Sequence, residues 1–240
     1  MNRRKALITG ASRGIGRAIA IEFAMAGYDL TITCHKESEQ LSSLAMTLME
    51  EYGIACNTFV GDLSQFSEVG RLFQSISDID VLINNAGISH IGLLSDTSSD
   101  DWDAVIGTNL NSAFYCTKLA LPLMVHKKSG KIINISSVWG QCGASMEVAY
   151  STSKGGLNAF TRALAKEMAP SNIQVNAIAC GMIDTDMNKC FSKEDIDEII
   201  ASIPADRMGK PEEVARLALQ LCTGNSYLTG QIITLDGGWM

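Results

Sequence analysis

The segment that most constrains the fold of this 240-residue chain is the glycine-rich run at residues 9–16. It follows a short apolar strand expected at residues 5–9 and precedes a helical pattern of apolar side chains. We expect Gly10 to make the tight turn, Gly14 to admit a pyrophosphate, and Gly16 to let the helix pack closely on the strand. Unpaired N–H groups at the helix N-terminus would also attract phosphate. The order predicts a dinucleotide site, although the same turn can form without a ligand.

Strand-like and helical runs alternate through the rest of the chain. Further strands are expected at residues 28–34, 54–60, 80–84, 131–135, 173–179 and 231–235. Helices are expected at 38–52, from about 64, at 102–126, from about 148 to Pro170, at 193–202 and at 211–221. This alternation, with no linker or repeat, predicts one α/β domain over residues 1–240. The domain would be a Rossmann-type doubly wound parallel sheet of seven strands with helices on both faces.

Composition argues against several other classes of protein. The net charge of −7 disfavours a nucleic-acid partner, and no apolar run reaches membrane-spanning length. The N-terminus lacks the apolar region and cleavage site of a signal peptide. Seven cysteines and three histidines are widely scattered, without Cys-x-x-Cys spacing. We therefore expect no disulfide framework, no metal site, and a cytoplasmic location.

The end of the second expected strand bears on the type of dinucleotide. Sites for an unphosphorylated ribose usually place Asp or Glu there, whereas this chain has His35 and Lys36. Together with Arg13 of the glycine loop, these side chains would pair with a 2′-phosphate, which favours NADP(H) over NAD(H). Glu37 and Glu39 lie close enough to weaken the preference, and Lys36 could equally be a solvated surface lysine.

Polar and small residues follow or flank other expected strands. Asp62 could meet an adenine amino group or help to cap the next helix. The Asn84–Gly87 segment could tie loops together and approach a cofactor closely. Asn109 and Asn111 fall inside the expected helix at 102–126, where asparagine is mildly unfavourable. Solvent exposure is the default explanation for both.

Tyr150 and Lys154 are expected one turn apart on the same face of a helix. A phenol titrates near ~10 and donates poorly at neutral pH, but a neighbouring ammonium favours the phenolate. The pair would suit proton transfer to or from a carbonyl oxygen. Alone, this spacing is common on ordinary helix surfaces. Ser137, at the end of the fifth expected strand, lies thirteen residues before Tyr150.

In their order and spacing, these motifs resemble the short-chain dehydrogenase/reductase family over essentially the full chain. The resemblance implies that Ser137 and Tyr150 hydrogen-bond a substrate carbonyl, that NADPH delivers hydride, and that Tyr150 supplies the proton. Lys154 would hold the nicotinamide ribose and lower the pKa of Tyr150, and Asn109 would anchor a water that relays protons. The resemblance also implies a homotetramer and a mechanism without a metal.

Carried onto this sequence, the resemblance assigns cofactor contacts to Gly10, Ser12, Arg13, Gly14, Ile15, Gly16, His35, Lys36, Asp62, Leu63, Asn85, Ala86, Gly87, Tyr150, Lys154, Gly181 and Ile183. It assigns substrate contacts to Ser137, Trp139, Glu147 and Met182. The long segment at about residues 181–209 would be a lid over the ligands.

Within the family the chain is most similar to 3-oxoacyl-[acyl carrier protein] reductases, but it departs from them at three places. Cys180 replaces the usual proline before Gly181, which predicts a looser backbone there. Of two basic positions used for carrier-protein docking, Lys128 matches one and the other is neutral Ser171. The active-site loop is bulkier at Trp139 and, together with Glu147, looks similar to reductases of an aminopentanone-modified lysine on elongation factor P.

Several functions follow as expectations from this resemblance. The first is reduction of a 3-oxoacyl thioester to the 3-hydroxyacyl product, as in fatty acid biosynthesis. The second is reduction of the aminopentanone on elongation factor P, where Glu147 could meet a substrate amine or simply be a surface carboxylate. Another small ketone or alcohol dehydrogenase, or a non-catalytic NADP-binding regulatory protein, are further alternatives.

Overall fold

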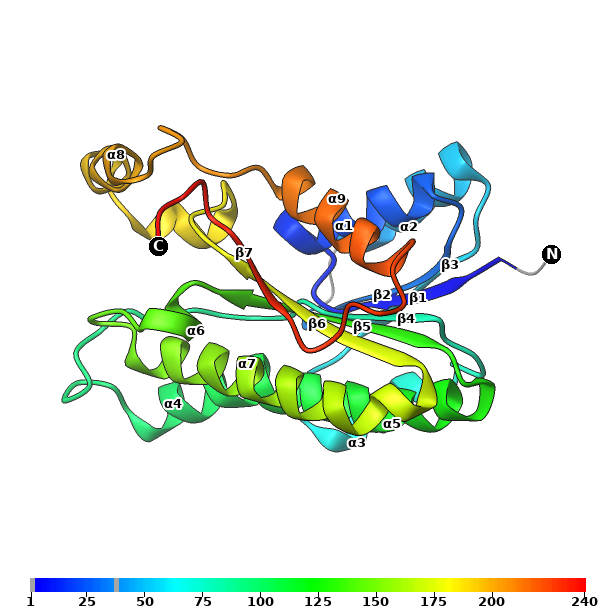
Figure 1. Cartoon of the computed structure of the whole chain (residues 1–240). Coiled ribbons are helices and arrows are strands. Elements are labelled where there is room, and N and C mark those ends of the chain that lie inside the picture. The colour runs from blue at the N-terminus through cyan, green and yellow to red at the C-terminus, as the bar shows by residue number, and fades with distance from the viewer. Residues whose placement is uncertain (1–2, 37–38) are drawn as a thin grey trace.

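The computed structural model describes residues 3–36 and 39–240, and its centre is one parallel β-sheet (Figure 1). Seven strands form the sheet in the order β3-β2-β1-β4-β5-β6-β7. Their bounds are β1 Lys5–Ile8, β2 Asp29–Cys34, β3 Cys56–Val60, β4 Val81–Asn84, β5 Gly130–Ser137, β6 Ile173–Cys180 and β7 Ile232–Leu235. The predicted Rossmann-type doubly wound sheet is confirmed.

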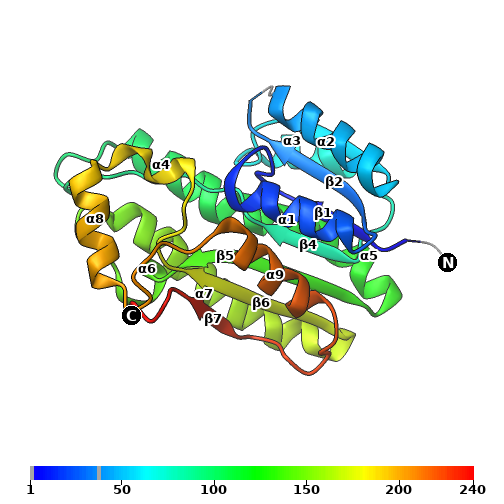
Figure 2. The same cartoon turned by 90° about the horizontal axis from the view of Figure 1, so that it is seen from above.

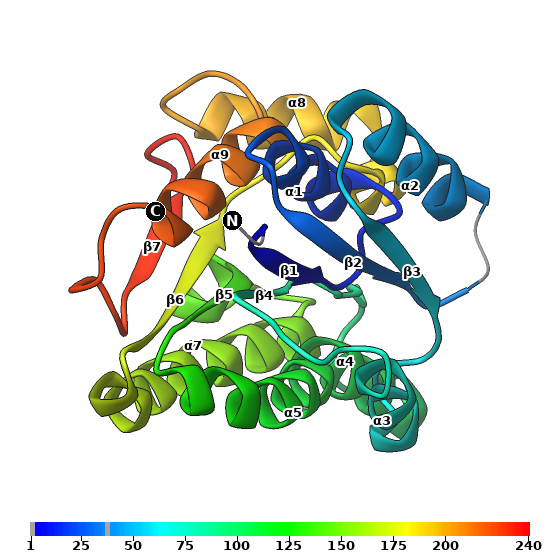
Figure 3. The same ribbon diagram turned by 90° about the vertical axis from the view of Figure 1, so that its right-hand side faces the viewer.

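Helices cover both faces of the sheet (Figure 3). One face carries α1 (Gly14–Met25), α2 (Glu39–Tyr52) and α9 (Pro211–Cys222). The other face carries α3 (Phe66–Phe73), α4 (Ser99–Ile106), α5 (Ser112–Lys127) and α7 (Val148–Met168). The short α6 (Trp139–Cys142) and α8 (Lys193–Ser202) lie beyond the carboxyl ends of the strands (Figure 2). Glu37 and Ser38, the latter the predicted start of α2, lie outside the described residues.

The central strands are buried on both sides, because their side chains alternate between two hydrophobic layers. Ala6 and Ile8 pack in the layer under α1, together with Phe23. Leu7, between them in sequence, points into the opposite layer with Met124 of α5. This double burial fixes the sheet in place and leaves its carboxyl edge free for loops.

The helix predicted at residues 102–126 is instead three consecutive segments, with a π-helical turn (Gly107–Asn111) between α4 and α5. The turn contains one residue more than an α-helix needs, which rotates Asn109 toward the sheet. Asn109 is 1% exposed, so solvent exposure is the wrong explanation for it. Asn111 is half-buried.

In the described part of the chain, no helix is long and apolar enough to cross a membrane. The six cysteines whose side chains are described there are all free thiols. Over the same residues, no group of three or more His, Cys, Asp or Glu side chains is arranged to hold a metal ion.

Candidate active site

Adjacent strands bring the predicted site residues to one edge of the sheet (Figure 2). Because β1, β4 and β5 are neighbours and parallel, the residues at or just after their carboxyl ends, Gly10, Asn85 and Ser137, share that edge. Helix α7 packs along β5 and carries Tyr150 and Lys154 within its first turns. The fold therefore gathers residues that are up to 144 positions apart in sequence, from Gly10 to Lys154.

The glycine loop between β1 and α1 has the geometry of a phosphate-binding turn. Gly10 has a φ of +66°, which favours glycine, and a Cβ at Gly16 would lie 2.2 Å from the Gly10 carbonyl oxygen. Arg13, the N-cap of α1, makes no side-chain capping bond, and the first turn contains no acidic residue. Ser12 and Ile15 flank this N-terminus. The loop and the helix dipole thus fit an anionic pyrophosphate.

Asn85 braces the glycine loop against the end of β4. Its Nδ2 donates to the carbonyl oxygens of Thr9 and Gly10, at 2.8 and 2.9 Å. The Thr9 hydroxyl in turn accepts hydrogen bonds from the N–H groups of Asn85 and Ala86, both at 3.0 Å. A Cβ at Gly10 would lie 2.9 Å from the Cα of Ala86, so the two segments are in close contact. The brace holds the backbone that would receive the cofactor.

The three basic side chains predicted to hold a 2′-phosphate come from two loops at this edge of the sheet. His35 and Lys36 follow β2 and are exposed. Arg13 comes from the glycine loop, and its guanidinium lies 3.8 Å from the carboxylate of Asp186. The end of β2 itself, at Cys34, offers no carboxylate.

Asp62 and Leu63 form the turn between β3 and α3. The Asp62 carboxylate accepts a hydrogen bond from the Ser64 N–H at 2.9 Å, and its carbonyl accepts one from the Gln65 N–H at 3.0 Å. Leu63 is buried beneath the turn. Asp62 therefore stabilises the turn that leads into α3, which begins at Phe66, and its contact with adenine stays a prediction.

Tyr150 and Lys154 face each other on α7. The Lys154 ammonium lies 5.6 Å from the centroid of the Tyr150 ring and donates a hydrogen bond to the Ile135 carbonyl at 2.8 Å. Lys154 is 4% exposed, and its burial lowers its pKa to about 8. Lys154 is therefore desolvated on the β5 side of the site, while Tyr150 beside it is half-buried.

Burial also dominates the acidity of Tyr150. It raises the pKa of the phenol above its ordinary value, while a hydrogen bond with Ser137 acts in the opposite direction. Ser137 is itself buried at the end of β5, and its hydroxyl accepts a bond from the Trp139 N–H at 3.2 Å. Ser137 and Tyr150 thus share one polar contact, with Lys154 beside the ring.

Asn109 connects the π-helical turn to the loop after β4. Its Oδ1 accepts from the Ile88 N–H at 2.8 Å, and its Nδ2 donates to the Ile88 carbonyl at 2.9 Å and to the Ser153 hydroxyl at 3.0 Å. A Cβ at Gly87 would lie 3.4 Å from Asn109 Oδ1 and 3.5 Å from Lys154 Nζ. The asparagine thus fixes the loop that passes directly beside the lysine.

The predicted substrate residues Trp139 and Glu147 lie together at the mouth of the site. The Glu147 carboxylate accepts hydrogen bonds from the Ser89 hydroxyl, at 3.0 Å, and from the indole N–H of Trp139. Burial raises the pKa of Glu147, and these two hydrogen bonds act in the opposite direction. Glu147 is the N-cap residue of α7 and precedes Tyr150 by three positions, one helical turn.

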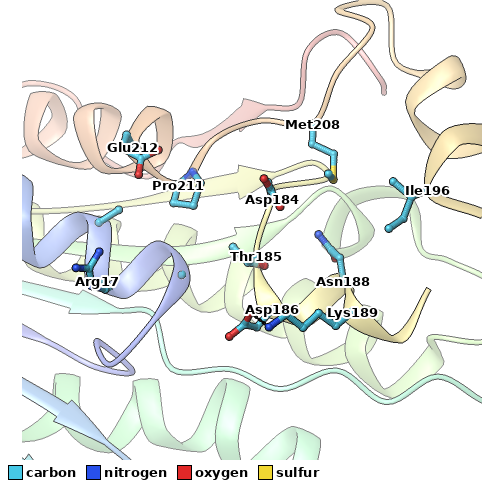
Figure 4. A pocket seen from close by; sticks show the side chains of 12 residues that line it. Arg17, Asp184, Thr185, Asp186, Asn188, Lys189, Ile196, Met208, Pro211 and Glu212 are labelled. Carbon is cyan, nitrogen blue, oxygen red and sulfur yellow. Dashed lines mark ion pairs between the residues drawn. The ribbon is translucent and has the colours of Figure 1, made fainter. Parts of the chain in front are cut away.

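The segment at residues 181–209 begins beside this site. Its two ends are joined, since the Gly209 N–H donates to the Met182 carbonyl and the Gly209 carbonyl accepts from the Asp184 N–H, both at 2.9 Å. Ile183 is buried, while Met182 is half-buried. A cavity of about 380 Å³ lies between this segment, α1 and α9 (Figure 4). Thr185 contacts the glycine loop here, at 3.3 Å from a Cβ built on Gly14.

The sequence predicts a looser backbone at Cys180-Gly181, and this is wrong. Cys180 is the last residue of β6, and its carbonyl accepts from the Val138 N–H at 2.9 Å. The Gly181 N–H donates to the Leu235 carbonyl, also at 2.9 Å. A cysteine continues the strand between β5 and β7, so both neighbours hold the backbone in place.

Comparison with known proteins decides the family. The family model of short chain dehydrogenases matches residues 4–196. The chain is a short-chain dehydrogenase/reductase. This short-chain dehydrogenase is 39% identical over 238 residues to the uncharacterized oxidoreductase YmfI of Bacillus subtilis, with 98% of each chain covered. It is 41% identical to the 3-oxoacyl-[acyl-carrier-protein] reductase FabG of Aquifex aeolicus, covering 97% of this chain and 95% of that protein.

A solved structure of similar fold agrees with this family assignment. YwfH, an NADPH-dependent reductase of bacilysin biosynthesis, superposes with a TM-score of 0.93 at 28% identity, covering 100% of this chain and 99% of that one. Membership of the family indicates an oxidoreductase that uses a nicotinamide cofactor.

Some residues of this short-chain dehydrogenase were not found by sequence reasoning. Ser89 binds Glu147 from the loop after β4, and Trp239 packs on Trp139 with ring centroids 5.0 Å apart. Neither residue belongs to a motif with fixed spacing. One feature of the sequence could have indicated the contact between the two indoles. Trp139 and Trp239 both follow carboxyl ends of strands in the same half of the sheet, and tryptophan is an uncommon residue type.

Proposed function

We propose that this protein is an NADPH-dependent reductase that acts on a ketone. The observation that carries the proposal is the convergence of Ser137, Tyr150 and Lys154 at the carboxyl edge of the sheet, beside a phosphate-binding turn. When bound, NADPH supplies a hydride for the carbonyl carbon. The glycine loop, braced by Asn85, would hold the pyrophosphate, and Lys154 would hold the nicotinamide ribose.

The protein's own part is to polarise the carbonyl and to move a proton. Ser137 and Tyr150 share a hydrogen bond, so a carbonyl oxygen placed between them receives two O–H donors. Tyr150 gives its proton to that oxygen as negative charge develops on it. Lys154, whose pKa is lowered to about 8, stabilises the resulting phenolate and exchanges a proton near neutral pH.

We further propose that the cofactor is NADP(H) rather than NAD(H), supported by Arg13, His35 and Lys36. Replacing Lys36 with aspartate should weaken NADPH binding about tenfold or more and narrow the gap to NADH, because a cation near the 2′-phosphate becomes an anion. Cofactor titration at one ionic strength measures both affinities. The control Lys166→Asp makes the same charge change at the far end of α7 and should alter neither. Equal affinities of the parent for the two cofactors would refute the preference.

Two substrates have specific support. The identity to FabG proteins favours a 3-oxoacyl thioester on acyl carrier protein. Glu147 favours an amino ketone, such as the aminopentanone-modified lysine of elongation factor P. Its carboxylate is half-buried one turn from Tyr150, and none of the ion pairs among described residues includes it. A substrate ammonium would offset the cost of burying that charge.

The surface expected to dock a carrier protein also bears on the choice. Lys128 and Ser171 are neighbours, since the side chain of Asn172 donates to the Lys128 carbonyl at 3.0 Å. Only one of the two positions is basic, so the expected electrostatic contact with a carrier protein is reduced. We therefore place the amino ketone first and the 3-oxoacyl thioester second.

One assay separates these substrates: NADPH consumption with a small amino ketone and with acetoacetyl thioester, side by side. The parent should have the higher kcat/KM for the amino ketone. Glu147→Gln should lower that kcat/KM about tenfold or more, since it removes the charge and keeps the shape. The same variant should leave the thioester reaction within about twofold.

Each other result of this assay has a definite meaning. A higher kcat/KM for the thioester, together with no effect of Glu147→Gln on either substrate, would favour the 3-oxoacyl reductase. Tight NADPH binding without turnover of either ketone would favour a non-catalytic regulatory protein. From the resemblance to the family, we also propose a homotetramer located in the cytoplasm, where free thiols such as those described here are stable.

A further inference from the structure

The residues after β7, 236–240, fold back over the substrate side of the site, and we call them the β7 extension. The Asp236 carboxylate holds this segment in a turn, accepting from the N–H groups of Gly238 at 3.0 Å and Met240 at 2.9 Å. A Cβ at Gly181 would lie 2.7 Å from the Cβ of Asp236, so the turn sits directly on the first residue of the predicted lid.

The β7 extension also contacts residues 202–205, near the C-terminal end of the predicted lid. The Trp239 indole N–H donates to the hydroxyl of Ser202, the last residue of α8, at 2.9 Å. The Ala205 N–H donates to the Gly237 carbonyl at 3.1 Å, and Ile203, 3% exposed, packs against Gly237. In Figures 1 and 2 the end of the chain lies next to α8.

On its other side, the β7 extension contacts the active-site loop. The ring of Trp239 packs on Trp139 with centroids 5.0 Å apart and planes inclined by 59°. The Trp139 indole N–H binds the carboxylate of Glu147, which Ser89 also holds at 3.0 Å. A continuous series of contacts therefore runs from Ser202 of α8 through two indoles to the mouth of the site.

We propose that Trp239 is a positioning residue that sets substrate affinity. It locks the end of α8 to Trp139, and Trp139 in turn aims the Glu147 carboxylate at the substrate. Its ring and its N–H make separate contacts, so both are needed for the lid and the carboxylate to be aligned at once. The inference rests on the proposed ketone reductase, and it concerns the substrate side and not the cofactor loop.

Two substitutions and a control test this proposal in steady-state assays with the ketone that the parent reduces faster. Trp239→Ala removes the ring and the N–H and should raise KM about tenfold or more, with kcat changed less than threefold. Trp239→Phe keeps a ring against Trp139 and should recover part of that loss. NADPH affinity should be unchanged throughout. As a control, Tyr227→Ala removes an aromatic ring that is 98% exposed and should change nothing.

A double-mutant cycle isolates the link to α8. Trp239→Phe and Ser202→Ala each remove the same hydrogen bond, so the double variant should raise KM no more than Trp239→Phe alone. Additive effects, or an unchanged KM in Trp239→Ala, would overturn the proposal. If Trp239→Ala does not fold, the cycle alone decides the outcome. A parent that reduces no ketone would instead refute the proposed function, and the inference with it.

Discussion

Replacing Tyr150 with phenylalanine is expected to lower kcat for NADPH-dependent ketone reduction by about 10²-fold or more. The substitution removes one oxygen and keeps the ring, so the contact with the Lys154 ammonium at 5.6 Å is retained. What is lost is the phenol O–H that we propose as the proton donor to a carbonyl oxygen beside Ser137. Stopped-flow or steady-state measurement of NADPH oxidation would show the loss directly.

The burial of Tyr150 explains why its loss should lower kcat. Burial raises the pKa of Tyr150, so the phenol is fully protonated at neutral pH and serves as donor in the reduction direction. NADPH affinity and Tm should stay close to those of the parent, which separates a chemical defect from a folding defect. Tyr227→Phe, at a position 98% exposed, is the matched control. A Tyr150→Phe variant with most of its activity would mean that another group donates the proton.

The second large effect is expected for Gly16→Ala. A Cβ there would lie 2.5 Å from the side-chain Nδ2 of Asn85 and 2.2 Å from the Gly10 carbonyl oxygen, a backbone atom, so a side-chain movement alone cannot relieve the clash. Helix α1 must move away from the loop, which breaks the brace of Asn85 on Gly10. Overpacking of this kind costs about 1–3 kcal/mol. We expect Tm to fall by roughly 2–12 °C and cofactor affinity by about tenfold or more.

Gly70→Ala is the matched control for this substitution. Gly70 lies inside helix α3, and a Cβ built on it meets nothing within 4 Å. Alanine there should leave cofactor binding unchanged and stabilise the helix by about 0.5–1 kcal/mol. Differential scanning calorimetry and cofactor titration of the two variants measure both effects. If Gly16→Ala binds NADPH as tightly as the parent, the loop is not the phosphate site.

Elements with strong local signals could be predicted from the sequence. Helix α8 was predicted with its observed bounds, since Ser192 and Asp195 form a capping box and mark its start. The start of α9 was predicted as well, because Pro211 occupies the first helical position, and the helix ends at Cys222, one residue beyond the predicted end. The glycine loop, too, could be predicted from its local glycine spacing, although Asn85 of the distant β4 end holds it in place.

Elements shaped by distant contacts could not be predicted. Strand β5 runs from Gly130 to Ser137, beyond its predicted end at 135, although its last residues are polar. Ser136 is buried there because its hydroxyl bonds to the Asn158 side chain at 2.7 Å, a partner 22 positions away. The π-helical turn likewise depends on Ile88 and Ser153, which no helix propensity can reveal. Ser89 and Trp239 were missed for the same reason.

The number of residues in the π-helical turn sets how α4 is rotated about its axis relative to α5. An α-helix advances about 100° per residue, so deleting one residue from Gly107–Asn111 would turn α4 by that angle relative to α5. Val105 of α4 and Cys116 of α5 are both buried, and they would no longer share the inner face with Asn109. A deletion here would therefore disrupt either the packing of α4 and α5 or the position of Asn109 beside Lys154.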